Sequence, residues 1–157
     1  MATLTVDRTM SEHPWAGGPH PWREWRRWPD HRIWWRRLPD GVHALTDGVA
    51  NTWHNLDELQ VERRYSTRHE QEHLLAGHDG CIGGVGEARV CFKAAQWLVP
   101  DPRKVADALV WAEGDLCLAA DHLWLPERGL RARLDVRFMH PAERRLINDL
   151  VRDAIDR

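Results

Sequence analysis

The sequence predicts an α+β fold, in which a small antiparallel β-meander is followed by a helical body. Two observations favour this fold. Short runs rich in aromatic and β-branched residues, separated by Asp-Gly turn signals, lie between residues 31 and 56. From about residue 58 onward, apolar residues recur at helical spacing between Gly and Pro breakers. The 157 residues correspond to one domain, which we place at 21–157.

The first elements are expected between Pro21 and residue 56. Residues 21–28 begin with Pro, carry several Trp and stop at a second Pro, which is typical of a short helix with a buried Trp face. Residues 31–38 end in a Pro-Asp-Gly turn, and the next apolar run ends in Asp-Gly. We therefore expect two short antiparallel strands, with 49–56 as the third.

A long helix is expected at about 58–76. Asp57 is an acceptable N-cap, and Gln60 follows three residues later, as in a capping box. The chain then contains neither Gly nor Pro until Gly77. Further helices are expected at about 87–98, after Pro102, from Asp115 to Pro126, around Leu130 and Leu134, and after Pro141.

Composition excludes several functional classes. The formal net charge is −2, so the chain as a whole has no field that would hold a polyanion. No apolar run approaches the ~20 residues of a membrane-spanning helix, and residues 1–20 lack the apolar stretch of a signal peptide. We expect a cytoplasmic protein with a flexible N-terminal arm over 1–20 and no membrane partner. Its three cysteines, Cys81, Cys91 and Cys117, are expected to be reduced.

One motif contains residues of the kind that form a catalytic metal site. His69-Glu70-Gln71-Glu72-His73 matches H-E-x-x-H, in which two His one turn apart leave the same helix face and can meet one zinc ion at about 2.0–2.1 Å. Glu70, about 100° around the helix, would reach the attacking water as a base. The alternative is a solvated helix face on which His and Glu fall at this spacing by chance.

A catalytic zinc needs a third protein ligand. Glu87 can reach across the motif helix if the two helices form a hairpin; the alternative makes it a first-turn acid favoured by the helix dipole. His78, Asp79 and Cys81 are rival ligands because they follow the motif closely, and His78 is the strongest of them. Peptide hydrolysis also needs a group that stabilises the negatively charged oxygen of the intermediate. The candidates for this role are His78 and Tyr65, and the sequence does not decide between them.

Several segments, in order, resemble one family. ERRYSTRHEQEHLLAGH (62–78) resembles the motif helix of ImmA/IrrE-type metallopeptidases, in particular the short versions found with actinobacterial phages and mobile elements. DGVHALTDG (40–48), EARVCFKAAQWLVP (87–100) and HPAERRLI (140–147) resemble other segments of that family, so the likeness covers about residues 21–150.

The resemblance implies a zinc-dependent endopeptidase with His69 and His73 as ligands, Glu70 as catalytic base and Glu87 as third ligand. It also implies a protein substrate, typically a helix-turn-helix repressor. A rival function is a non-catalytic regulatory module on the same fold that grips a repressor or antitoxin.

The sequence also departs from the family pattern. Arg68, Gln71 and Glu72 stand where small or apolar residues are usual, so we expect one side of the motif helix to be less buried. Arg89 and Cys91 replace the common Glu and Asp/Asn of the second helix, and a ligand from position 89 is the alternative to Glu87.

The basic, Trp-rich stretch 22–37 has a composition that suits single-stranded nucleic acid. We expect instead that Trp22, Trp25 and either Trp34 or Trp35 pack into the core and that arginine stems cover them, and we expect no direct nucleic-acid binding.

Overall fold

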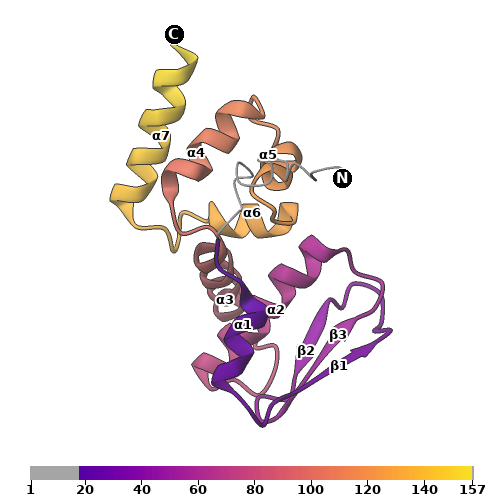
Figure 1. Cartoon of the computed structure of the whole chain (residues 1–157). Helices are drawn as coiled ribbons and strands as arrows, with labels where there is room; N and C mark the ends of the chain where they lie inside the picture. Colours follow the sequence, from indigo (N-terminus) through magenta and orange to yellow (C-terminus); the bar gives the residue numbers. More distant parts are fainter. Residues whose placement is uncertain (1–17, 157) are drawn as a thin grey trace, which may run out of the picture.

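The α+β fold is confirmed. The computed structural model describes residues 18–156, so most of the arm expected over 1–20 lies outside the described residues. Within the described part a three-stranded sheet lies at one end of a helical body (Figure 1). The expected domain over 21–157 contains one cluster of buried apolar side chains, drawn mainly from the helices after the motif.

The N-terminal part contains the short helix and the three strands. Helix α1 (Pro21–Glu24) continues as a 3₁₀ turn (Trp25–Arg27), and the strands are β1 (Arg32–Arg36), β2 (Ala44–Thr46) and β3 (Asn51–Asn55). The strand order is β1-β3-β2, with β1 parallel and β2 antiparallel to β3. The predicted antiparallel meander is therefore wrong, because β3 lies between the two strands that were expected to pair.

The reason lies in the side chains of β3 and in the turn before it. Thr52 and His54 are fully buried, which suits a central strand, whereas four of the five residues of β1 are exposed. The carboxylate of Asp47 accepts backbone hydrogen bonds from Val49, Ala50 and Asn51, each at 2.9 Å. This turn closes the β2–β3 hairpin tightly, and the longer link over 37–43 leaves β1 on the far edge.

The long motif helix is confirmed as α2 (Gln60–Ala76), and it ends at Gly77 in the left-handed conformation. The predicted capping box is wrong. Leu59 occupies the N-cap position without a side-chain hydrogen bond, and the carboxylate of Asp57 lies 3.8 Å from Arg37 instead.

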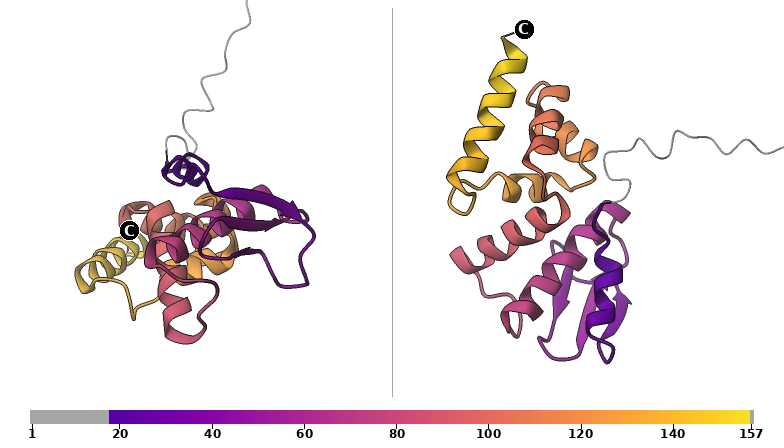
Figure 2. Two further views of the ribbon diagram at one scale, coloured as in Figure 1. Left: turned by 90° about the horizontal axis from the view of Figure 1, so that it is seen from below. Right: turned by 60° about the vertical axis from the view of Figure 1, so that its left-hand side comes forward.

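Five helices complete the body: α3 (Gly84–Leu98), α4 (Pro102–Trp111), α5 (Leu116–His122), α6 (Glu127–Arg133) and α7 (Pro141–Ile155). Asp101 and Asp115 cap α4 and α5 through their side chains. Helix α3 begins three residues before the predicted start, and α5 stops at His122 instead of continuing to Pro126. In Figure 2, α3 and α6 lie between the sheet end and the α4–α7 end.

The expected exposure of one side of α2 is also wrong, because Arg68, Gln71 and Glu72 are buried. Arg68 forms an ion pair with Glu72 and stacks over the ring of Trp97 at 4.2 Å. The Gln71 amide donates a 2.8 Å hydrogen bond to the carbonyl of Pro21. Helices α1 and α3 thus cover this side of α2. No helix among residues 18–156 is long and apolar enough to cross a membrane.

Candidate metal centre

Helices α2 and α3 pack side by side and bring the expected metal ligands together. The Nε2 atom of His69 lies 2.9 Å from Glu87 Oε1, and that of His73 lies 3.4 Å from Glu87 Oε2. The two Nε2 atoms are 3.1 Å apart. Glu87 is therefore the residue that the fold brings to both motif histidines.

These spacings fit a zinc ion. In a tetrahedral site with bonds of about 2.0–2.1 Å, neighbouring donor atoms lie about 3.3–3.4 Å apart. The distances among His69, His73 and Glu87 are 2.9 to 3.4 Å. Two imidazoles and one carboxylate are also a known ligand set for catalytic zinc, with the fourth position left for water.

Burial argues against the alternative of a solvated helix face. The side chains of His69 and His73 are 16% and 2% exposed, and that of Glu87 is 22% exposed. If Glu87 only interacted favourably with the dipole of its own helix, there would be no reason for its carboxylate to contact two histidines of another helix.

Without an ion, these groups form a charged pair. Although burial opposes it, hydrogen bonds to Cys91 and Glu87 raise the pKa of His69 to about 10. The hydrogen bond to His69 in turn lowers the pKa of Glu87 to about 2. A bound cation would take the place of the proton in holding this carboxylate.

The outer nitrogen of each motif histidine also has a partner. Cys91 Sγ lies 3.7 Å from Nδ1 of His69, and Nδ1 of His78 lies 3.1 Å from Nδ1 of His73. Donor atoms of His69, Glu87 and Cys91 lie within 4.8 Å of one another, so this trio could also hold an ion. We favour the set with His73, because Cys91 contacts the ring nitrogen of His69 that faces away from His73 and Glu87.

The rival ligands occupy other places. His78 is next to the outer nitrogen of His73, and the thiol of Cys81 forms a hydrogen bond with Glu87, which the backbone N–H of Ile82 also approaches at 3.4 Å. Within residues 18–156, Asp79 forms no hydrogen bond or ion pair with either motif histidine. Position 89 carries Arg, whose guanidinium stacks on Phe138 at 5.5 Å.

A cavity of about 390 Å³ opens beside these residues. Its walls come from the motif face of α2, the start of α3, α6 and strand β2 with the residues before it. Glu70 lines this cavity and is only 6% exposed, and burial raises its pKa to about 7. A carboxyl group of this kind is suited to both take and give a proton near neutral pH.

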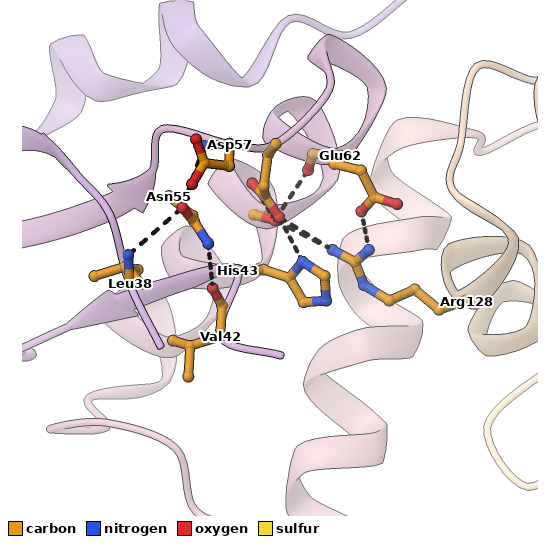
Figure 3. A network of polar contacts seen from close by, with 9 residues as sticks. Leu38, Val42, His43, Asn55, Asp57, Glu62 and Arg128 are labelled. Carbon is orange, nitrogen blue, oxygen red and sulfur yellow. Dashed lines mark hydrogen bonds and ion pairs between the residues drawn. The ribbon is translucent and has the colours of Figure 1, made fainter. Parts of the chain in front are cut away.

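A polar network, drawn in Figure 3, contributes His43, Ser66 and Arg128 to the lining of the cavity. His43 Nδ1 lies 2.5 Å from the buried carboxylate of Glu58, which also accepts from the Ser66 hydroxyl at 3.2 Å. Arg128 forms an ion pair with Glu62 and donates to Ser66 at 3.2 Å. The donor atoms of His43, Glu58 and Glu62 could also group around a cation, but Arg128 already supplies the positive charge there.

Sequence reasoning missed this network. Arg128 is 66 residues from Glu62, and no motif connects the two positions. His43 is 15 residues from Glu58, across two strands. Only the H-E-x-x-H helix nearby could have directed attention to them.

Comparisons of the chain with protein-family models, with curated proteins and with solved structures give no match. The resemblance to ImmA/IrrE-type metallopeptidases therefore stays a prediction from the motif segments.

Proposed function

We propose that this protein is a zinc-dependent endopeptidase of the cytoplasm. The proposal depends on one observation: side-chain donor atoms of His69, His73 and Glu87 lie within 3.4 Å of one another. The three residues line a cavity that Glu70 also lines. A zinc ion held there would supply a Lewis acid that polarises the scissile carbonyl and lowers the pKa of water to about 7.

Glu70 is the proposed base. It takes a proton from the attacking water and passes it to the nitrogen of the leaving amine. Its position between the two histidines in sequence keeps it off the ligand set, while its burial at the cavity wall shields the proton transfer from bulk solvent.

His43 is our candidate for the group that contacts the carbonyl oxygen. Tyr65 also lines the cavity, but its hydroxyl donates a 3.3 Å hydrogen bond to the carbonyl of Cys91. His43 lines the same cavity, and its Nδ1 lies beside the Glu58 carboxylate. With Nδ1–H donated to that carboxylate, Nε2 can donate to the carbonyl oxygen only when the ring is the doubly protonated imidazolium, a form that burial disfavours by lowering the pKa of His43. His78 faces His73 and is not among the lining residues.

Strand β2 supports a peptide substrate. In the antiparallel β2–β3 pair, the backbone N–H and C=O groups of residues 43, 45 and 47 point toward β3. Two hydrogen bonds show this pattern: Asn55 N–H donates to the carbonyl of His43, and Asp47 N–H donates to the carbonyl of Asn51. The N–H and C=O groups of Ala44 and Thr46 therefore point to the cavity side, where β2 is the edge of the sheet. An extended peptide could pair there and lie across the site.

The proposed substrate is a regulatory protein such as a helix-turn-helix repressor, which follows from the resemblance alone. The test begins with metal content. Protein purified without a His tag should carry about one zinc per chain, and His69→Ala and His73→Ala should lose it. Full zinc occupancy in both variants would refute the site.

Activity is tested next with Glu70→Gln, which should keep the zinc and the fold but lose hydrolysis by several orders of magnitude. The substrates would be casein and any repressor encoded beside the gene. Equal cleavage by the variant would refute the role of Glu70. Zinc retention with no cleavage by either protein, combined with repressor binding, would instead favour the regulatory binding module.

A further inference from the structure

In the part of the chain that the structure describes, one face of the sheet has no helix packed on it. Trp35 of β1 packs against Trp22 of α1 and His54 of β3, and Arg63 of α2 stacks on it, so this side of the sheet faces the helices. Alternate residues point to the other side. We call that side the open sheet face, and it consists of Arg32, Trp34, Arg36, Leu45, Asn51, Trp53 and Asn55. In Figure 1 the sheet lies at the margin of the molecule.

Aromatic and apolar side chains form the centre of the open sheet face. Trp34 is 38% exposed and Leu45 is 43% exposed. Trp34 and Trp53 are direct partners on adjacent strands, which lie about 4.8 Å apart. The sequence left open whether Trp34 or Trp35 packs inward: Trp35, although 41% exposed, packs on Trp22 and His54, whereas Trp34 lies on the open sheet face.

Unpaired cations flank this aromatic centre. Arg32 and Arg36 are each two residues from Trp34, or about 6.6 Å along the strand, on the same face. Neither forms an ion pair with another residue in the range 18–156, whereas Arg37, the residue after β1, lies near Asp57. Residues 21–40 contain six arginines against three acids, although the whole chain has a net charge of −2.

The polar groups near the open sheet face are already engaged. The Asn51 amide accepts from Trp34 Nε1 at 2.9 Å and donates to Asp47 at 2.7 Å. The Asn55 amide donates to the carbonyl of Val42 and accepts from two backbone N–H groups. The carboxylate of Asp47 is held by its turn. These amides are not available to read the edges of bases.

We propose that the open sheet face binds single-stranded nucleic acid without sequence preference. Bases stack on Trp34 and Trp53, and phosphates pair with Arg32 and Arg36, because an aromatic platform flanked by cations complements a strand with exposed bases and regular negative charge. A duplex keeps its bases stacked inside and cannot use the platform. A peptide partner would need apolar contact or the backbone edge of β1, but not a cation on each side of Trp34.

The test is the binding of a fluorescein-labelled dT15 oligonucleotide, followed by anisotropy at low salt. Trp34→Ala should weaken binding about 5- to 150-fold, the range for loss of one stacked base, and Trp34→Phe should restore part of the affinity. Trp111→Ala is the matched control, because Trp111 is exposed on α4 and should leave binding unchanged.

The arginines are tested by salt dependence. Two phosphate contacts predict a slope of about −1.4 in a plot of log affinity against log salt, and the double variant Arg32→Gln, Arg36→Gln should bring it toward zero. Circular dichroism checks that each variant is folded. Absence of dT15 binding at low salt overturns the proposal, as does equal competition by duplex DNA or by polyglutamate. Equal losses in the Trp34 and Trp111 variants also overturn it, whatever the zinc measurements show.

Discussion

His54 predicts a pH dependence of stability. Its ring is fully buried between Trp22 at 5.7 Å and Trp35 at 5.1 Å, and neither ring nitrogen has a hydrogen-bond partner among residues 18–156. Burial, together with the nearby charge of Arg63, lowers the pKa of His54 from 6.5 to about 4. The folded protein therefore holds this histidine neutral over a range where the unfolded chain protonates it.

The sign follows from proton binding. Between pH 6.5 and pH 4 the unfolded state binds a proton that the folded state does not, so the free energy of unfolding is highest above pH 6.5 and falls as the pH is lowered. With these two pKa values, His54 alone removes about 2.5 kcal/mol between pH 7.5 and pH 4.5.

The assay is urea denaturation at pH 7.5, 5.5 and 4.5, with a chelator present so that metal binding does not contribute. His54→Phe keeps an aromatic ring at this position but removes the group that titrates. The loss of unfolding free energy between pH 7.5 and pH 4.5 should therefore be smaller by about 2.5 kcal/mol than in the wild type. His122→Phe is the control, because His122 stacks on Trp111 but is only half-buried, and it should change the loss much less.

A direct measurement on the wild-type protein tests this prediction independently of any packing change in the variant. The His54 resonance of the wild-type protein, followed by NMR, should titrate near pH 4. Titration near 6.5, or the full wild-type pH dependence in His54→Phe, would refute the reasoning.

Two further predictions concern the metal centre. Glu87→Ala should weaken zinc binding by far more than the ~0.3–1 kcal/mol that a first-turn acid contributes to stability, measured against a competing chelator; unchanged affinity would refute Glu87 as the third ligand. Cys91→Ala should weaken zinc binding about 10- to 100-fold, and Cys91→Asp should restore it, because Cys91 contacts the outer nitrogen of His69. Cobalt substitution gives the second readout: a thiolate charge-transfer band that disappears in Cys91→Ala would show instead that Cys91 is a ligand.

The local features of this protein could be predicted from its sequence. Helix α2 and the one-turn spacing of His69 and His73 depend on neighbours within four residues, as do the caps of α4 and α5 at Asp101 and Asp115. One local prediction, the N-cap of α2, was nevertheless wrong, because another interaction competed for the capping side chain. Asp57 was a plausible cap for α2, but its carboxylate lies near Arg37, and the helix begins at Gln60 without it.

Tertiary structure alone decided how these elements combine. The sequence could not show that β3 lies between β1 and β2, because strand order depends on which side chains are buried against α1 and α2. It also could not show that Arg68 and Glu72 lie buried beneath Trp97, or that Arg128 meets Glu62 across 66 residues. Short-range periodicity specifies an element, whereas contacts between distant residues depend on how the faces of several elements pack at once. For the same reason the sequence could not decide between Trp34 and Trp35: the tertiary structure packs Trp35 on Trp22 and His54 and leaves Trp34 on the open sheet face.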